Sequence, residues 1–141
     1  MTGSSQVLYW DASAVLSLLF ADCHSATALE WWQSGSIHLL STLAFVETHA
    51  VITRLERSKA LSTTLTQEAR HNLTAWPWRR TTAQPAWEVV DSLANRWPLR
   101  GADLWHLACA TSLHQQLPEL HLLTFDNSLQ EAAQGEGLLR Q

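Results

Sequence analysis

Positive charge and cysteine are both scarce in this chain of 141 residues. There is a single lysine, Lys59, and the formal net charge is −4. This excludes the strongly basic surface with which duplex-binding proteins neutralise phosphates. The two cysteines, Cys23 and Cys109, form neither a CxxC pair nor a disulfide framework. We therefore expect both to pack in the core of a protein from a reducing compartment.

Long hydrophobic runs are also missing. No stretch approaches the ~20 apolar residues of a membrane span, and the apolar run near the N-terminus follows no positive segment and breaks at Asp11. Neither a membrane protein nor a signal peptide is expected. With 46% hydrophobic and 16% charged residues, the composition is typical of a globular protein rather than a disordered one. The sequence predicts one soluble, cytoplasmic domain over residues 1–141.

Tryptophan, in contrast, is abundant, with eight residues. So many cannot all be fully buried in a small domain, and large aromatics left at the surface favour interfaces. Trp31 and Trp32 are neighbours that would point about 100° apart on a helix, so at least one should meet a partner. We expect core and dimer packing, although stacking on unpaired RNA bases is an alternative.

Short apolar segments separated by helical patterns indicate the fold class. Buried strands are expected at Val7–Trp10, Ile37–Leu40 and Leu120–Phe125, with short edge strands at Trp78–Thr82 and Leu138–Leu139. Helices are expected to begin at Ala12 and Thr42 and to cover Cys23–Gln33, Thr64–Trp76, Pro85–Asn95, Ala102–Leu113 and Asn127–Ala133. This alternation, without a hairpin signal, predicts an α/β fold, a three-layer α/β/α sandwich with a central parallel sheet.

Several helix starts carry local signals. Asp22 precedes one helix as a candidate cap, and Thr64 with Gln67 forms a capping-box pattern. Pro85 suits the first position of its helix, which would place Trp87 on the inner face.

Four acidic residues occupy equivalent places in this pattern. Asp11 and Asp126 follow strands directly, whereas Glu47 and Asp103 lie in early turns of helices. Each alone is explained by helix capping or by the helix dipole. If the strand ends share one edge of the sheet, however, the four converge, and clustered carboxylates need protons or a cation. Oxygen ligands favour Mg²⁺ or Mn²⁺, which can lower the pKa of a bound water and neutralise charge on a phosphate.

The segments around these acids resemble the four acidic motifs of PIN domains, most closely those of VapC-type toxins of bacterial toxin-antitoxin pairs. They are Trp10–Val15, Phe45–Glu47, Arg100–Ala108 and Leu123–Leu129, and together they span almost the whole chain in the order of the family. The resemblance implies a metal-dependent endoribonuclease with a parallel sheet. It also implies a homodimer and a cognate antitoxin whose tail blocks the acidic pocket.

Residue by residue, the resemblance assigns the catalytic and metal-binding roles to Asp11, Glu47, Asp103 and Asp126, with Mg²⁺ or Mn²⁺ as cofactor. Ser13 and Thr124 match small hydroxyl positions beside the metal site. His106 shares a helical face with Asp103 and either orients that carboxylate or fills the space beside it. We expect a supporting role.

Positive residues could guide the RNA backbone. The candidates are Arg54, Arg57, Lys59, Arg79 and Arg80. Scattered arginines on solvated helix faces are the simpler explanation for this set.

Two other functions fit parts of the pattern. A haloacid-dehalogenase-like phosphatase also begins with an apolar strand and an Asp, but it requires a second Asp where this chain has Ser13. A catalytically inactive RNA- or protein-binding module of the PIN fold is the stronger alternative, because a complete set of acids does not prove turnover. Metal-dependent cleavage of RNA distinguishes this module from the enzyme.

Overall fold

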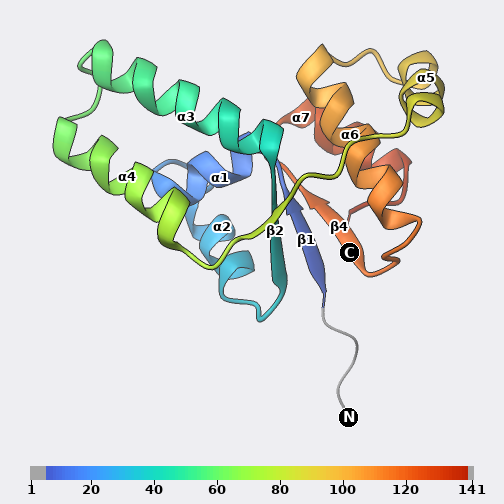
Figure 1. Ribbon diagram of the computed structural model, residues 1–141, viewed down its shortest axis with the longest axis horizontal. Coiled ribbons are helices and arrows are strands. Elements are labelled where there is room, and N and C mark those ends of the chain that lie inside the picture. The colour runs from blue at the N-terminus through green and yellow to red at the C-terminus, as the bar shows by residue number, and fades with distance from the viewer. Residues whose placement is uncertain (1–5, 140–141) are drawn as a thin grey trace.

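The computed structural model describes residues 6–139 and contains a parallel four-stranded sheet. Its strands are β1 (Val7–Trp10), β2 (Ile37–Ser41), β3 (Arg79–Thr81) and β4 (Leu120–Leu123), in the order β3-β2-β1-β4. Helices flank the sheet on both sides (Figure 1). The predicted α/β/α sandwich is therefore confirmed.

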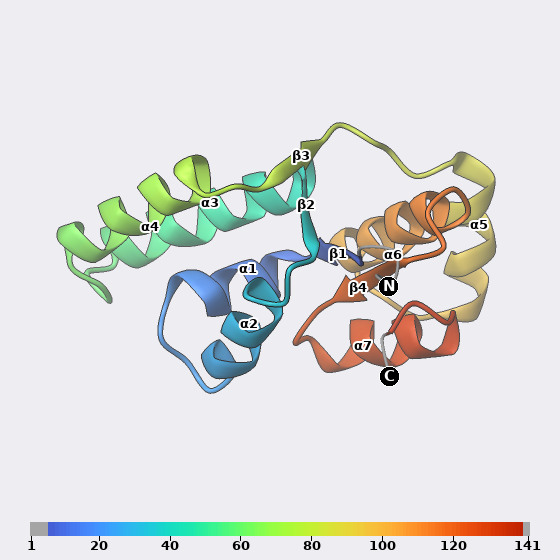
Figure 2. The ribbon, with the colours of Figure 1, turned by 90° about the horizontal axis from the view of Figure 1, so that it is seen from below.

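The helices divide between the two faces of the sheet (Figure 2). One layer contains α1 (Ala12–Leu19), α2 (Ser25–Trp32), α3 (Thr42–Arg57) and α4 (Thr63–Ala75). The other contains α5 (Trp87–Arg96), α6 (Gly101–His114) and α7 (Asn127–Gly135). Within the described residues, none of these helices is long and apolar enough to cross a membrane.

Strand β1 supplies both cores because successive side chains of a strand point to opposite faces. Val7 and Tyr9 pack with the α5–α7 layer, whereas Leu8 and Trp10 pack with the α1–α4 layer. All four are buried. A central strand covered on both faces explains why this segment is apolar throughout rather than alternating. It also sends two neighbouring residues, Tyr9 and Trp10, into separate environments.

Three predicted helix starts are wrong. Ser62 caps α4 by accepting a hydrogen bond from the Leu65 N–H at 3.2 Å, so the Thr64–Gln67 box does not begin the helix. The α2 helix begins after His24, and Asp22 instead holds the preceding turn by accepting from the His24 N–H. Pro85 precedes α5, whose N-cap is Ala86. Several residues near each start could cap it, and backbone geometry decides among them.

The predicted last strand is also absent from the described chain. Leu138 accepts one backbone hydrogen bond from the Leu122 N–H at 2.8 Å, but no strand forms at Leu138–Leu139. Gly137, just before this segment, has a φ of 76°.

Exposure differs from expectation at two residues. Trp87, placed on an inner helix face by its spacing, is 90% exposed. It is the first residue of α5, so the periodicity of the helix interior does not determine where its side chain lies. Cys23 is exposed as well, whereas Cys109 is buried as predicted. Trp31 and Trp32 both pack partly against the α1–α4 core, so the fold itself covers much of this pair.

Candidate functional site

Strands β1, β2 and β4 end close to where α1, α3 and α7 begin (Figure 1). Asp11 follows β1 and caps α1, and Asp126 follows β4 and caps α7. Ser41, the last residue of β2, caps α3 by accepting from the Ala44 N–H at 3.1 Å, which sets Glu47 in the second turn of that helix. Asp103 lies in the first turn of α6.

Asp11 is the most enclosed of the four acids, with 3% of its surface exposed. Its Oδ1 accepts hydrogen bonds from the Ser13 hydroxyl at 2.7 Å and from the Ala14 N–H at 2.9 Å. Its Oδ2 accepts from the Thr124 hydroxyl at 2.5 Å. Burial raises the pKa of Asp11, although these three donors act in the opposite direction. The structure thus brings both predicted hydroxyl residues to Asp11.

Asp103 and Asp126 share a cavity of about 300 Å³. The remaining lining residues are Pro98, Leu99, Arg100 and Ser128. Asp126 Oδ1 accepts from the Leu129 N–H at 2.9 Å. The Asp103 side chain, in contrast, makes no hydrogen bond or ion pair with any residue in the described range 6–139. Asp103 is therefore a half-buried carboxylate without a partner at the wall of a cavity.

Electrostatic coupling connects all four acids. The pKa of Asp103 is raised, first by burial and then by the negative charges of Asp126, Asp11 and Glu47, while His106 acts in the opposite direction. Like charges have this effect only when they lie close together. The pKa of Asp103 therefore responds to the charge of each of the other three acids.

Glu47 is held by His106. The His106 Nε2 lies 2.6 Å from Glu47 Oε1, and His106 Nδ1 lies 2.7 Å from the Tyr9 hydroxyl. Helical spacing had paired His106 with Asp103, but the hydrogen bond crosses to α3 instead. His106 is a buried residue of α6, and from there its side chain reaches Glu47 on α3.

Two residues near the acids were not recognised from the sequence. Tyr9 was assigned to the core because it lies in an apolar strand, although its position two residues before Asp11 places it on the α6 side of the site. Burial raises its pKa, so the phenol keeps its proton. Arg100 precedes Asp103 by one helical turn and lines the same cavity. That spacing is the one signal that could have identified Arg100.

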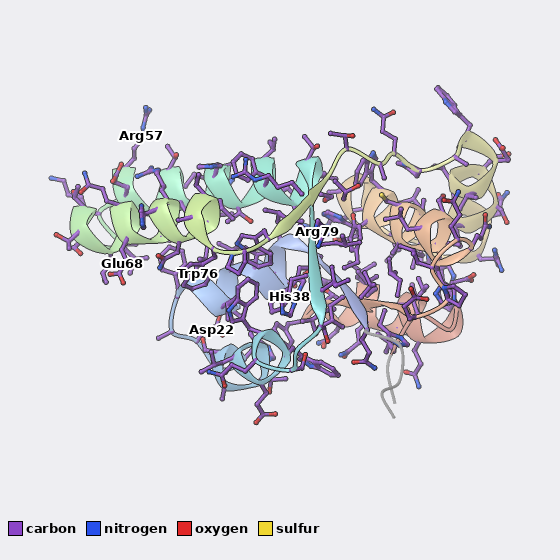
Figure 3. The ribbon with its side chains drawn as sticks, turned by 60° about the horizontal axis from the view of Figure 1, so that its bottom comes forward. Asp22, His38, Arg57, Glu68, Trp76 and Arg79 are labelled. Carbon is purple, nitrogen blue, oxygen red and sulfur yellow. The ribbon has the colours of Figure 1, made fainter. Side chains whose placement is uncertain are left out.

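The predicted RNA-binding cations lie in two places. Arg54 and Arg57 are in the last turn of α3, with Lys59 just beyond it. Arg79 and Arg80 lie on β3, where the Arg80 guanidinium stands 5.4 Å from the centre of the Phe45 ring. Figure 3 shows Arg57 at the outer end of α3 and Arg79 on the edge strand, well apart. The five are exposed but do not form one patch.

The donor set suits a hard divalent cation. Among residues 6–139 no three His, Cys, Asp or Glu side chains are close enough together to enclose an ion by themselves. Mg²⁺, however, commonly binds one or two carboxylates and keeps several waters. Asp103, which has no partner within the described range, and Asp126 of the same cavity can supply those oxygens, and the surrounding acids favour a cation there.

A parallel sheet with acids at its carboxyl edge places the protein in a class, and comparison with known families identifies that class. Residues 8–135 match the PIN domain, so the chain belongs to the PIN domain family. PIN domains are typically nucleases and generally depend on metal ions.

Individual relatives are ribonucleases. The chain is 29% identical over 135 residues to ribonuclease VapC45 of Mycobacterium tuberculosis (strain CDC 1551 / Oshkosh), covering 93% of this chain and 92% of the relative. The same values hold for ribonuclease VapC49 of Mycobacterium tuberculosis (strain ATCC 25618 / H37Rv). The crystal structure of Mycobacterium tuberculosis VapC20, a toxin that cleaves the sarcin-ricin loop, matches with a TM-score of 0.61 and 14% identity, covering 89% of this chain and 94% of that one. This last likeness is one of fold.

Proposed function

We propose that this protein is a Mg²⁺- or Mn²⁺-dependent endoribonuclease and the toxin of a toxin-antitoxin pair. The observation that carries the proposal is Asp103, a carboxylate without a partner in the described structure that shares a cavity with Asp126 and has its pKa raised by burial and then by the other three acids. A helix-capping acid would be expected to engage backbone N–H groups. An acid that binds a cation needs its oxygens free.

The four acids have distinct roles in this proposal. Asp103 and Asp126 supply oxygens to the cation, while Asp11 is held rigid by Ser13 and Thr124 and adds negative charge behind them. Glu47 faces the site from α3. A cation bound there would lower the pKa of a water molecule and neutralise charge developing on the phosphate.

Arg100 is positioned to meet the RNA backbone, because it lines the acidic cavity and forms no ion pair within residues 6–139. Replacing Arg100 by Gln should weaken RNA binding and lower the slope of log K against log salt by about 0.7, the value for one phosphate contact on a single strand. Arg57→Gln, measured in the same way, compares the contributions of the two arginines to RNA binding. An equal effect at both positions would contradict this role for Arg100.

Cleavage of a single-stranded RNA with Mg²⁺, with Mn²⁺ and with excess EDTA tests the activity directly. We expect cleavage in either metal and none in EDTA, because the carboxylates do no chemistry without the cation. Asp103→Asn should also be inactive. Cleavage that persists in EDTA contradicts the proposal, and RNA binding without cleavage by the wild type would identify the inactive binding module instead.

Partners are part of the same proposal. We expect a homodimer, which sedimentation distinguishes from a monomer of 15.8 kDa. A cognate antitoxin should inhibit cleavage and protect the acidic cavity. The test for the antitoxin is to look for a small neighbouring gene and to assay its product for inhibition of cleavage. A monomer at micromolar concentration would contradict the homodimer but not the proposed ribonuclease activity.

A further inference from the structure

Tyr9, His106 and Glu47 form a continuous chain of hydrogen bonds across three elements. Tyr9 on β1 has no exposed surface, and the His106 side chain on α6 is 1% exposed. The hydroxyl lies 2.7 Å from Nδ1, and Nε2 lies 2.6 Å from Glu47 Oε1 on α3. The imidazole also makes edge contacts with the rings of Tyr9 and Trp105, each with its centroid 5.7 Å away.

The direction of each hydrogen bond follows from what the end groups can do. An ionised carboxylate only accepts, so His106 Nε2 carries the hydrogen that is donated to Glu47. In a neutral imidazole the other nitrogen is then an acceptor, and the Tyr9 hydroxyl donates to it. Tyr9 and Glu47 therefore select the same tautomer from opposite sides of the ring.

We propose that Tyr9 and His106 are positioning residues that hold Glu47 through Oε1 and leave Oε2 as the oxygen directed to the cation. Glu47 Oε2 accepts no hydrogen bond from the part of the chain that the structure describes. Both ring nitrogens of His106 have partners, so neither is available as a metal ligand. The involvement of the cation rests on the proposed function; the tautomer does not.

The tautomer can be read in metal-free protein from the ¹⁵N signals of the imidazole and the proton on Nε2. Because the chain has seven histidines, His106→Gln identifies the signals by their loss. In the wild type we expect the Nε2–H tautomer with a proton protected from solvent exchange. Tyr9→Phe keeps the ring but removes the donor to Nδ1, so the Nδ1 signal should shift to that of a free acceptor and the Nε2 proton should exchange faster. An Nδ1–H tautomer in the wild type, or unchanged signals in Tyr9→Phe, overturns the proposal.

Mn²⁺ affinity measures the consequence without reference to cleavage. Loss of an outer-shell partner of a metal ligand typically weakens binding by about 10- to 100-fold. We expect such a loss in His106→Ala, partial recovery in His106→Gln, whose amide can donate to Glu47, and a loss of about tenfold in Tyr9→Phe. Electron spin-echo spectroscopy with ¹⁵N-histidine should show no nitrogen bound directly to Mn²⁺. A direct nitrogen ligand, or equal affinity in all variants, overturns the proposal.

Thr48→Val is the matched control. It also removes a buried hydroxyl oxygen, beside Glu47 on α3, but that oxygen has no hydrogen-bond partner among residues 6–139. Both the imidazole signals and Mn²⁺ affinity should be unchanged in this variant. If the imidazole signals and Mn²⁺ affinity change as expected while the wild type cleaves no RNA, the proposed function fails and the positioning roles stand. If the wild type cleaves RNA but Tyr9→Phe has no effect, the positioning roles fail and the proposed function stands.

Discussion

Two buried histidines lie on opposite faces of the sheet, and their hydrogen bonds are similar up to the last partner. On the α5–α7 side, Tyr9 contacts His106, which donates to the Glu47 carboxylate. On the α1–α4 side, Trp10 donates from Nε1 to His38 Nδ1 at 3.0 Å, and His38 Nε2 donates to the Trp32 carbonyl at 3.0 Å. In both cases a residue of β1 contacts Nδ1 of the imidazole, and Nε2 contacts an oxygen atom.

The difference between these histidines is the nature of that oxygen. The Trp32 carbonyl belongs to the backbone of α2, and the His38 ring stacks on the Trp32 side chain with centroids 4.4 Å apart. Figure 3 shows His38 on the side of the sheet that carries α2. His38 therefore links elements of the core, whereas His106 ends on a carboxylate facing a site. Burial and satisfied hydrogen bonds do not by themselves make a histidine functional. What distinguishes His106 is that its last hydrogen-bond partner is the Glu47 carboxylate rather than a backbone carbonyl.

The largest effect is expected from Asp103→Asn, which changes the site and spares both histidines. Losing an anionic ligand should lower RNA cleavage on the order of a thousandfold, because metal-ion catalysis supplies several kcal/mol and each 1.4 kcal/mol is a factor of ten. Metal-free stability should be equal or higher, since one of four repelling charges is removed. Cleavage assays and thermal melts without metal measure the two effects.

The same variant has a characteristic pH dependence. The pKa of Asp103 is raised in the folded state, so the folded protein binds the proton more tightly than the unfolded chain. The corresponding stability is present below the unfolded pKa and is lost as pH rises through the folded pKa. Asp103→Asn should reduce that loss. A variant that is less stable without metal yet cleaves normally would make Asp103 a structural acid.

The next largest effect is expected from breaking the hydrogen bonds that join Trp10, His38 and Trp32. His38→Ala leaves the Trp10 N–H buried without an acceptor and removes a stacked ring, which should cost about 2 to 4 kcal/mol of unfolding free energy. Mn²⁺ affinity should be retained, in contrast to His106→Ala. Urea unfolding and metal titration of both variants test the comparison, and it fails if the two lose stability and affinity in the same proportion.

A smaller effect is expected in the pH dependence of stability through His38. Burial lowers the pKa of His38, so the unfolded chain takes up a proton first as pH falls. This stability is present above the unfolded pKa of about 6.5 and is lost as pH falls through the folded pKa. Urea unfolding at pH 7.5 and 5.5 should show less loss for His38→Gln than for the wild type. His49→Gln should reduce the loss as well, because burial and Arg70 lower the pKa of that histidine too.

The smallest change in stability is expected at Trp87, which belongs to neither chain of hydrogen bonds. With 90% of its surface exposed, Trp87→Ala should alter unfolding free energy by no more than about 0.5 kcal/mol. Urea unfolding measures this directly. A larger loss, found together with dissociation in sedimentation, would place Trp87 in the interface of the expected dimer.

Apart from the strand expected at Leu138–Leu139, the sequence alone determined the order of strands and helices and the positions of the acids along them. These depend on local patterns: β1 is apolar throughout because both its faces are covered, and an acid after a strand can cap the next helix. Asp11 and Asp126 do cap α1 and α7. Their spacing also carried the family resemblance, since the motifs lie within short continuous segments.

Only the tertiary structure decided which side chains are partners. Spacing along α6 placed His106 and Asp103 on one face, but periodicity gives a direction and not the element that lies there. Folding put Glu47 of α3 within 2.6 Å of His106 Nε2 and left Asp103 without a partner in the described chain. Thr124 likewise reaches Asp11 because β4 pairs with β1. Such contacts join residues far apart in the chain, so they depend on how the layers pack, which no local pattern specifies.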